Sequence, residues 1–81
     1  MSPIEDAIFA LLEAAGPGKS IDPMAVAKTV DAEGWRRLLP QVRAVAVGLA
    51  RQDRVVILRH NKPADPDRFK GVWRMRGPSD L

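Results

Sequence analysis

The sequence predicts a mainly helical α+β domain in which three helices precede one two-stranded β-hairpin. Two observations support this prediction. Apolar residues recur at intervals of three and four over the first two thirds of the chain, which is typical of helices that bury one face. After Asp53 the spacing becomes strand-like, because a run rich in β-branched residues is followed by an alternation of apolar residues with arginines.

A capping sequence opens the first predicted helix. Ser2 is followed by Pro3 and, three positions after the serine, by Glu5. A serine and a glutamate at this spacing form a capping box that satisfies free backbone N–H groups, and proline suits the first helical position. The buried stripe comprises Ile4, Ile8, Leu11, Leu12 and Ala15. The Gly-Pro-Gly sequence at 16–18 is expected to end the helix.

A second, shorter helix is expected to follow a brief extended piece. Asp22 and Pro23 repeat the start signal of the first helix. The buried face of this second helix comprises Val26, Ala27 and Val30. Residues 31–34 then form the break before the third helix.

The third helix is expected to run from about Trp35 or Pro40 to Gln52. Its inward stripe comprises Leu38, Val42, Val45, Ala46 and Leu49. Pro40 has no backbone N–H group, so it suits a first turn better than the middle of a helix. Residues 35–39 are therefore expected to form a turn or a short helical lead-in.

One hairpin is expected to complete the domain. Its first strand is the Val-Val-Ile-Leu run at 55–58, and its second is 72–76, where arginines alternate with Trp73 and Met75. The connection from His60 to Gly71 contains two prolines and two aspartates, which favours a long ordered loop or a mobile tip. Residues 77–81 are expected to be frayed.

Positive charge is concentrated in the second half of the chain. Residues 36–81 carry eleven Lys or Arg against four Asp, whereas residues 1–35 carry two basic against six acidic residues. Such a cationic segment attracts phosphate backbones or other acidic surfaces. The chain has no cysteine, and no stretch approaches the roughly 20 apolar residues of a membrane span. We therefore expect one cytoplasmic domain over residues 1–81, with no membrane partner.

The element order is that of a winged helix-turn-helix, with the second and third helices as the turn-linked pair and the loop at 60–71 as the wing. Three segments carry a resemblance to a known family: Ile21, Pro23, Val26 and Ala27; Trp35, Arg36, Leu38, Pro40, Val42 and Arg43; and Lys62, Pro63, Asp65, Pro66, Gly71, Arg74 and Arg76. On these residues the chain resembles a small bacterial winged-helix-like domain family of unknown function. The resemblance spans nearly the whole chain and implies the fold, but it implies almost nothing about activity.

Catalytic and cofactor sites are not expected. The Gly-Pro-Gly-Lys-Ser sequence at 16–20 looks like the end of a phosphate-binding loop, but that loop needs glycine where Glu13 stands, and it follows a strand rather than a helix. His60 is the only histidine, so a nucleophile has no obvious base. Asp65 and Asp67 are too few ligands for a hard cation. We predict no enzyme, no metal and no cofactor.

The basic surface instead predicts binding to double-stranded DNA, with a regulatory role as the expected function. RNA is an alternative ligand. In a helix-turn-helix the third helix enters the major groove, while flanking cations bind phosphates. This geometry selects Arg36, Arg37, Gln41, Arg43, Arg51, Lys62, Arg68 and Lys70. The amide of Gln41 has the donor and acceptor that read adenine, whereas Arg37, Arg43 and Arg51 are better suited to phosphate. A solvated rim is the alternative for any single arginine.

A protein-interaction or homodimerisation module without nucleic-acid binding is the alternative function. The exposed middle of the third helix offers no polar group that would distinguish bases, and Gly48 costs about 1 kcal/mol of helix propensity relative to alanine. Small residues let a partner approach closely.

Phe9 lies off the apolar stripe of the first helix. It either packs against a neighbouring loop or takes part in self-association. The predicted interaction face comprises Phe9, Ala44, Val47 and Gly48.

Overall fold

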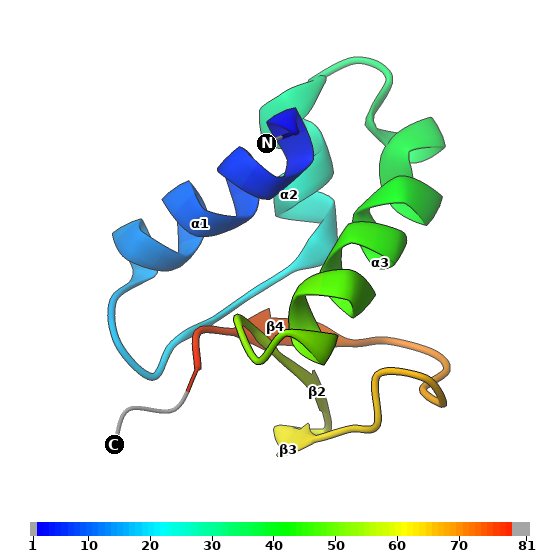
Figure 1. Ribbon diagram of the computed structural model, residues 1–81. Coiled ribbons are helices and arrows are strands. Elements are labelled where there is room, and N and C mark those ends of the chain that lie inside the picture. Colours follow the sequence, from blue (N-terminus) through cyan, green and yellow to red (C-terminus); the bar gives the residue numbers. More distant parts are fainter. Residues whose placement is uncertain (1, 79–81) are drawn as a thin grey trace.

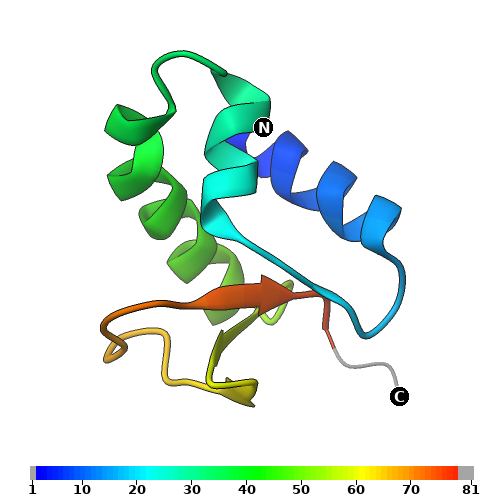
Figure 2. The ribbon, with the colours of Figure 1, turned by 180° about the vertical axis from the view of Figure 1, so that it is seen from behind.

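The computed structural model describes residues 2–78. In this part of the chain three helices lie over one face of a four-stranded antiparallel sheet (Figures 1 and 2). The helices are α1 (Pro3–Ala15), α2 (Pro23–Val30) and α3 (Trp35–Arg51). The strands are β1 (Ser20–Ile21), β2 (Val56–Arg59), β3 (Lys62–Pro63) and β4 (Arg74–Arg76). The predicted α+β class, mainly helical, is confirmed.

The first two helices begin where the sequence predicts. The Ser2 hydroxyl accepts from the backbone N–H of Glu5 at 3.1 Å, and the Asp22 carboxylate accepts from that of Met24 at 2.7 Å. Each bond satisfies an N–H group that has no partner inside its own helix. Gly16 ends α1 at φ 94°, a conformation that glycine adopts without steric cost.

Helix α3 begins at Trp35, which is the earlier of its two predicted starts. Residues 35–39 are helical and continuous with the rest of α3, and Pro40 lies inside the helix. The missing N–H of Pro40 removes one backbone hydrogen bond there. Leu38 and Leu39 pack against the hydrophobic core, and this packing offsets the loss by holding the first turns of α3 in place.

The sheet is larger than the predicted two-stranded hairpin, and that prediction is wrong in strand number. The expected pair of β2 and β4 is present, with Ile57 opposite Met75. Strand β1 adds to β4 and strand β3 adds to β2, so the order is β1-β4-β2-β3. The two added strands have two residues each. They form because the free backbone groups along β4 and β2 need hydrogen-bond partners. The sequence did not predict them because two residues are too few to show an alternating pattern.

The β2–β4 connection, residues 60–73, is predicted over residues 60–71 to be a long ordered loop or a mobile tip, and in the structure it begins with a tight turn that leads into β3. His60 and Asn61 have φ values of 54° and 65°, and Arg59 pairs with Lys62 across them. Two successive residues with positive φ are the signature of a two-residue type I′ hairpin turn. The backbone N–H of Ala64 donates to the carbonyl of Ile57 at 2.8 Å, which continues the pairing beyond β3.

The core lies between the helices and the sheet. Its fully buried members come from every layer and include Ile8 of α1, Val26 of α2, Val42 of α3 and Met75 of β4. Trp35 and Trp73 are half-buried and pack against this core. None of the helices in residues 2–78 has the length and apolar composition of a membrane span. Of the predicted frayed end, residues 79–81 lie outside the described part of the chain.

Candidate nucleic-acid interface

Helix α3 has one face against the core and one face in solvent. Val42, Ala46 and Leu49 are buried on the inner face. The exposed residues of α3 are Arg36, Arg37, Pro40, Gln41, Arg43, Ala44 and Arg51. The helical projection predicts that Gln41, Ala44, Val47, Gly48 and Arg51 all point outward. Gln41, Ala44 and Arg51 are in solvent, but Val47 and Gly48 are half-buried, so the prediction of a fully exposed face is wrong for these two.

Arg43 attaches the β2–β4 connection to α3. Its Nη2 donates to the carbonyl oxygen of Phe69 at 2.6 Å, and its Cζ lies 3.8 Å from the centroid of the Phe69 ring. Phe69 is only 4% exposed and meets Trp73 edge-on at 5.2 Å. Arg68 and Lys70 flank Phe69 in the sequence and are exposed. The contact therefore places two exposed cations beside α3.

Arg51 makes a second attachment, further along α3. Its guanidinium forms an ion pair with the carboxylate of Asp67, and the side chains are 63% and 55% exposed. The Asp67 backbone in turn donates to the Asp65 carboxylate at 2.9 Å. An exposed pair of this kind contributes only about 0.2–1 kcal/mol to stability. Its larger consequence is electrostatic, because Asp67 offsets the charge of Arg51.

Arg37 is also paired with a carboxylate. Its Nη2 lies 3.0 Å from Oδ2 of Asp31, and the Arg37 side chain is 75% exposed. Asp31 additionally accepts from the backbone N–H groups of Gly34 at 3.0 Å and Glu33 at 3.1 Å. These bonds stabilise the ionised carboxylate, so the pKa of Asp31 is lowered, first by the Gly34 N–H and then by Arg37. The Asp31 side chain thereby ties the α2–α3 turn to the start of α3.

The other predicted contacts, all exposed, are Arg36, Gln41, Lys62, Arg68 and Lys70. Within residues 2–78, no carboxylate lies within ion-pair distance of the four cations among them. The Cζ of Arg36 lies 4.8 Å from the centroid of the Trp35 ring, and Nζ of Lys28 lies 4.9 Å from the same centroid. Two cations therefore gather on Trp35 where α2 and α3 meet.

The predicted interaction face is divided between two places. Ala44, Val47 and Gly48 follow one another along α3, and a Cβ atom added to Gly48 would meet nothing within 4 Å. Phe9 belongs to α1, where the guanidinium of Arg54 lies 4.7 Å from its ring centroid. Phe9 lines a hollow to which none of the three α3 residues contributes.

Sequence reasoning missed two arginines that hold the sheet region together. Arg59 donates to the carbonyl of Val72 at 2.6 Å, and its guanidinium lies 3.2 Å from the position of a Cβ added to Gly71. Arg74 donates to the Ser20 hydroxyl at 2.7 Å. These partners are far apart in the sequence, so local spacing contained no signal for them. Beside Arg59, Gly71 has a φ of 82°, a backbone conformation that favours glycine.

Among residues 2–78, no group of three or more potential metal ligands comes together. The family model described as "Protein of unknown function (DUF3253)" covers residues 1–78 of the chain. No curated protein matches the chain.

Proposed function

The chain belongs to the DUF3253 family, and we propose that this member is a winged-helix domain that binds double-stranded nucleic acid mainly through backbone phosphates. The order of helices and strands, with β1 paired to β4 and β4 to β2, supports the winged helix-turn-helix assignment. In this assignment α2 and α3 are the turn-linked pair, and the β2–β4 connection is the wing.

The contact between Arg43 and Phe69 is the observation that carries the proposal. It joins the exposed face of α3 to the wing at the point where Arg68 and Lys70 stand. In proteins of this type the recognition helix lies in the major groove of the duplex. Cations on the adjoining loop bind phosphates and so fix the orientation of the protein. Arg36 extends the same charge to the beginning of α3.

Two intramolecular ion pairs reduce the number of arginines that are available to bind phosphate. Arg37 and Arg51 already have carboxylate partners, so a phosphate must compete with Asp31 and Asp67 for them. The principal phosphate contacts in the proposal are therefore Arg36, Lys62, Arg68 and Lys70. With Gln41 as its main polar group for reading bases, such a surface binds with little sequence preference, and affinities of about 10⁻⁴ to 10⁻⁶ M are typical.

A protein partner on α3 is the second candidate function. The observation in its favour is the open space beside Gly48, next to the exposed methyl group of Ala44. A helix of another protein, or of a second copy, can approach such a surface closely because no side chain projects from Gly48.

A salt titration with a random-sequence duplex separates the two functions. Phosphate binding weakens with salt at a log–log slope of about −0.9 for each phosphate contacted. Lys70→Gln is expected to make this slope less steep by about 0.9, the value for one phosphate contact. Lys19→Gln, a matched exposed lysine in the α1–β1 loop, removes the same charge and is expected to leave the slope unchanged. Equal effects of the two variants would show that only net charge matters. Salt-insensitive self-association without duplex binding would favour the protein partner.

A further inference from the structure

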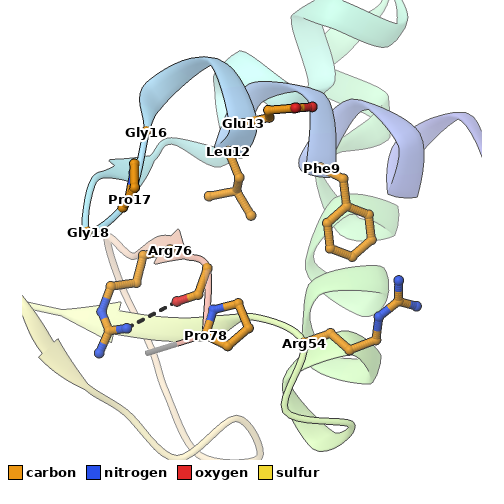
Figure 3. A pocket seen from close by; sticks show the side chains of 10 residues that line it. Phe9, Leu12, Glu13, Gly16, Pro17, Gly18, Arg54, Arg76 and Pro78 are labelled. Carbon is orange, nitrogen blue, oxygen red and sulfur yellow. Dashed lines mark hydrogen bonds between the residues drawn. The ribbon is translucent and has the colours of Figure 1, made fainter. Parts of the chain in front are cut away.

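An open hollow of about 820 Å³ lies between the second half of α1, the loop that follows it and the residues after β4 (Figure 3). Its apolar walls are formed by Phe9, Leu12, Pro17 and Pro78. The Phe9 ring and the Leu12 side chain point into it (Figure 3). In Figure 1 the end of α1 and the last described residues lie on the side away from the exposed face of α3. The hollow is therefore distinct from the proposed duplex-binding surface.

Arg54 and Arg76 line this hollow at opposite edges, and the Arg76 guanidinium is turned outward from Phe9 and Leu12 (Figure 3). The guanidinium of Arg54 lies 4.7 Å from the Phe9 ring centroid. Arg76 donates to the carbonyl of Gly77 at 3.1 Å, a bond that uses one of its five N–H groups. In residues 2–78 neither arginine has a carboxylate within 4.0 Å. The carboxylate of Glu13, on the rim, is turned away (Figure 3). Among the described residues, the hollow thus combines an apolar floor with two arginines that have no carboxylate partner.

In the loop after α1, Pro17 is the only residue with a side chain among the three that line the hollow. Gly16 and Gly18 both line it, and their φ values of 94° and 77° turn the chain through a bend. A Cβ atom at either position would meet nothing within 4 Å. Residues 16–18, the first three of the sequence that resembles a phosphate-binding loop, therefore form part of the wall of this hollow.

We propose that the hollow binds a small organic anion with an apolar body, of the aromatic carboxylate class. The walls offer contact to a ring, and each guanidinium is a planar donor that matches a carboxylate. The volume lies within the roughly 300–1,000 Å³ of small-molecule sites. The arrangement disfavours cations, which Arg54 and Arg76 repel, and strongly hydrated inorganic anions, which gain nothing from Phe9 and Leu12. This inference is independent of duplex binding.

The test is a titration of the full chain with 1-naphthoate, followed through its backbone amide resonances. Saturable shifts are expected at Phe9, Leu12, Gly16 and Gly18. Arg54→Gln and Arg76→Gln are each expected to weaken binding about threefold to tenfold, the range of one charge-assisted hydrogen bond at a partly exposed site. The neutral analogue 1-naphthalenemethanol is expected to bind more weakly by a similar factor. The matched control, Arg68→Gln, removes an exposed arginine outside the hollow and is expected to change nothing.

Three results overturn the proposal. One is the absence of saturable shifts at the hollow in the folded wild-type chain. Another is binding that Arg54→Gln and Arg76→Gln leave unchanged while circular dichroism shows both variants folded, because the guanidiniums would then have no part in recognition. The third is movement of the same amide resonances on simple dilution without naphthoate, because a second copy of the chain would then be the occupant.

Discussion

The guanidinium of Arg43 lies over the Phe69 ring, with its Cζ 3.8 Å from the ring centroid, while Nη2 donates to the carbonyl of the same residue at 2.6 Å. One side chain on α3 thus holds both the ring and the backbone of a residue 26 positions away. Phe69 is buried against Trp73, so the contact connects α3 to the β2–β4 connection through the core.

Loss of this contact is expected to destabilise the fold. Arg43→Met keeps the aliphatic stem but removes the hydrogen bond and the cation–π contact. Because such interactions are worth about 0.5–1.5 kcal/mol each, we expect the free energy of unfolding in urea to fall by about 1–2 kcal/mol. Arg68→Met, at an exposed position, is expected to change it by no more than about 0.5 kcal/mol. Equal losses in the two variants would show that the contact contributes nothing.

Replacement of Gly48 by alanine is expected to stabilise the isolated chain. Gly48 lies in α3 with space for a Cβ atom, so Gly48→Ala gains about 0.5–1 kcal/mol of helix propensity. Gly16→Ala is the matched control, because it also has space but has a φ of 94°; the strained backbone is expected to reverse the sign. Urea unfolding of both variants measures the difference. A loss of stability in Gly48→Ala would contradict this account, because it would mean that a methyl group disrupts a contact at Gly48.

A negative charge in the middle of α3 is expected to impair duplex binding. Ala44 is exposed on the proposed groove face, where a carboxylate would meet phosphates, so Ala44→Glu is expected to weaken binding about tenfold. Ala14→Glu introduces the same charge at an exposed position of α1 and controls for the change in net charge. Fluorescence anisotropy with a labelled random duplex provides the measurement. Comparable losses in the two variants would argue against a groove contact by α3.

The stability contributed by Asp31 is expected to depend on pH. Its pKa is lowered in the folded chain by the Gly34 N–H, Arg37 and the Glu33 N–H. A carboxyl group with a depressed folded pKa stabilises the fold above its unfolded pKa of about 3.9, and this stabilisation is lost as the pH falls through the folded value. The stability difference between the wild type and Asp31→Asn is therefore expected to be constant near neutral pH and to shrink below about pH 4. An NMR titration midpoint for the Asp31 carboxyl at or above 3.9 would contradict this account.

Local sequence signals predicted the helices well. Ser2 and Asp22 are caps because a side-chain oxygen next to a helix start can reach a free N–H within a few residues. The buried positions of α3 follow from apolar residues that recur with the helical period of 3.6 residues. Pro40 misled the prediction toward a later start, because its local preference was outweighed by the packing of the turn before it.

Charge density was visible in the sequence, but the partners of the charges were not. Eight residues were proposed for nucleic acid, and the structure gives Arg37 and Arg51 carboxylate partners and Arg43 a backbone carbonyl. Whether a guanidinium is available to a ligand depends on which acceptors the fold brings within about 3 Å. That information is absent from local spacing when the partner lies on another element.

The sequence by itself determined the α+β class and the helix starts at Pro3 and Pro23, because each depends on signals within one segment. The strand-like patterns of two separate segments predicted the pairing of β2 with β4. The buried face of α1 was predicted only in part, since Ile4 and Ile8 are buried but Ala15 is exposed. Only the tertiary structure decided that β1 and β3 extend the sheet and that Arg43 binds Phe69. It alone brought Arg54 and Arg76 to opposite sides of one hollow. These features join residues distant in the chain, and they arise when unpaired backbone groups and long cationic side chains find acceptors during packing.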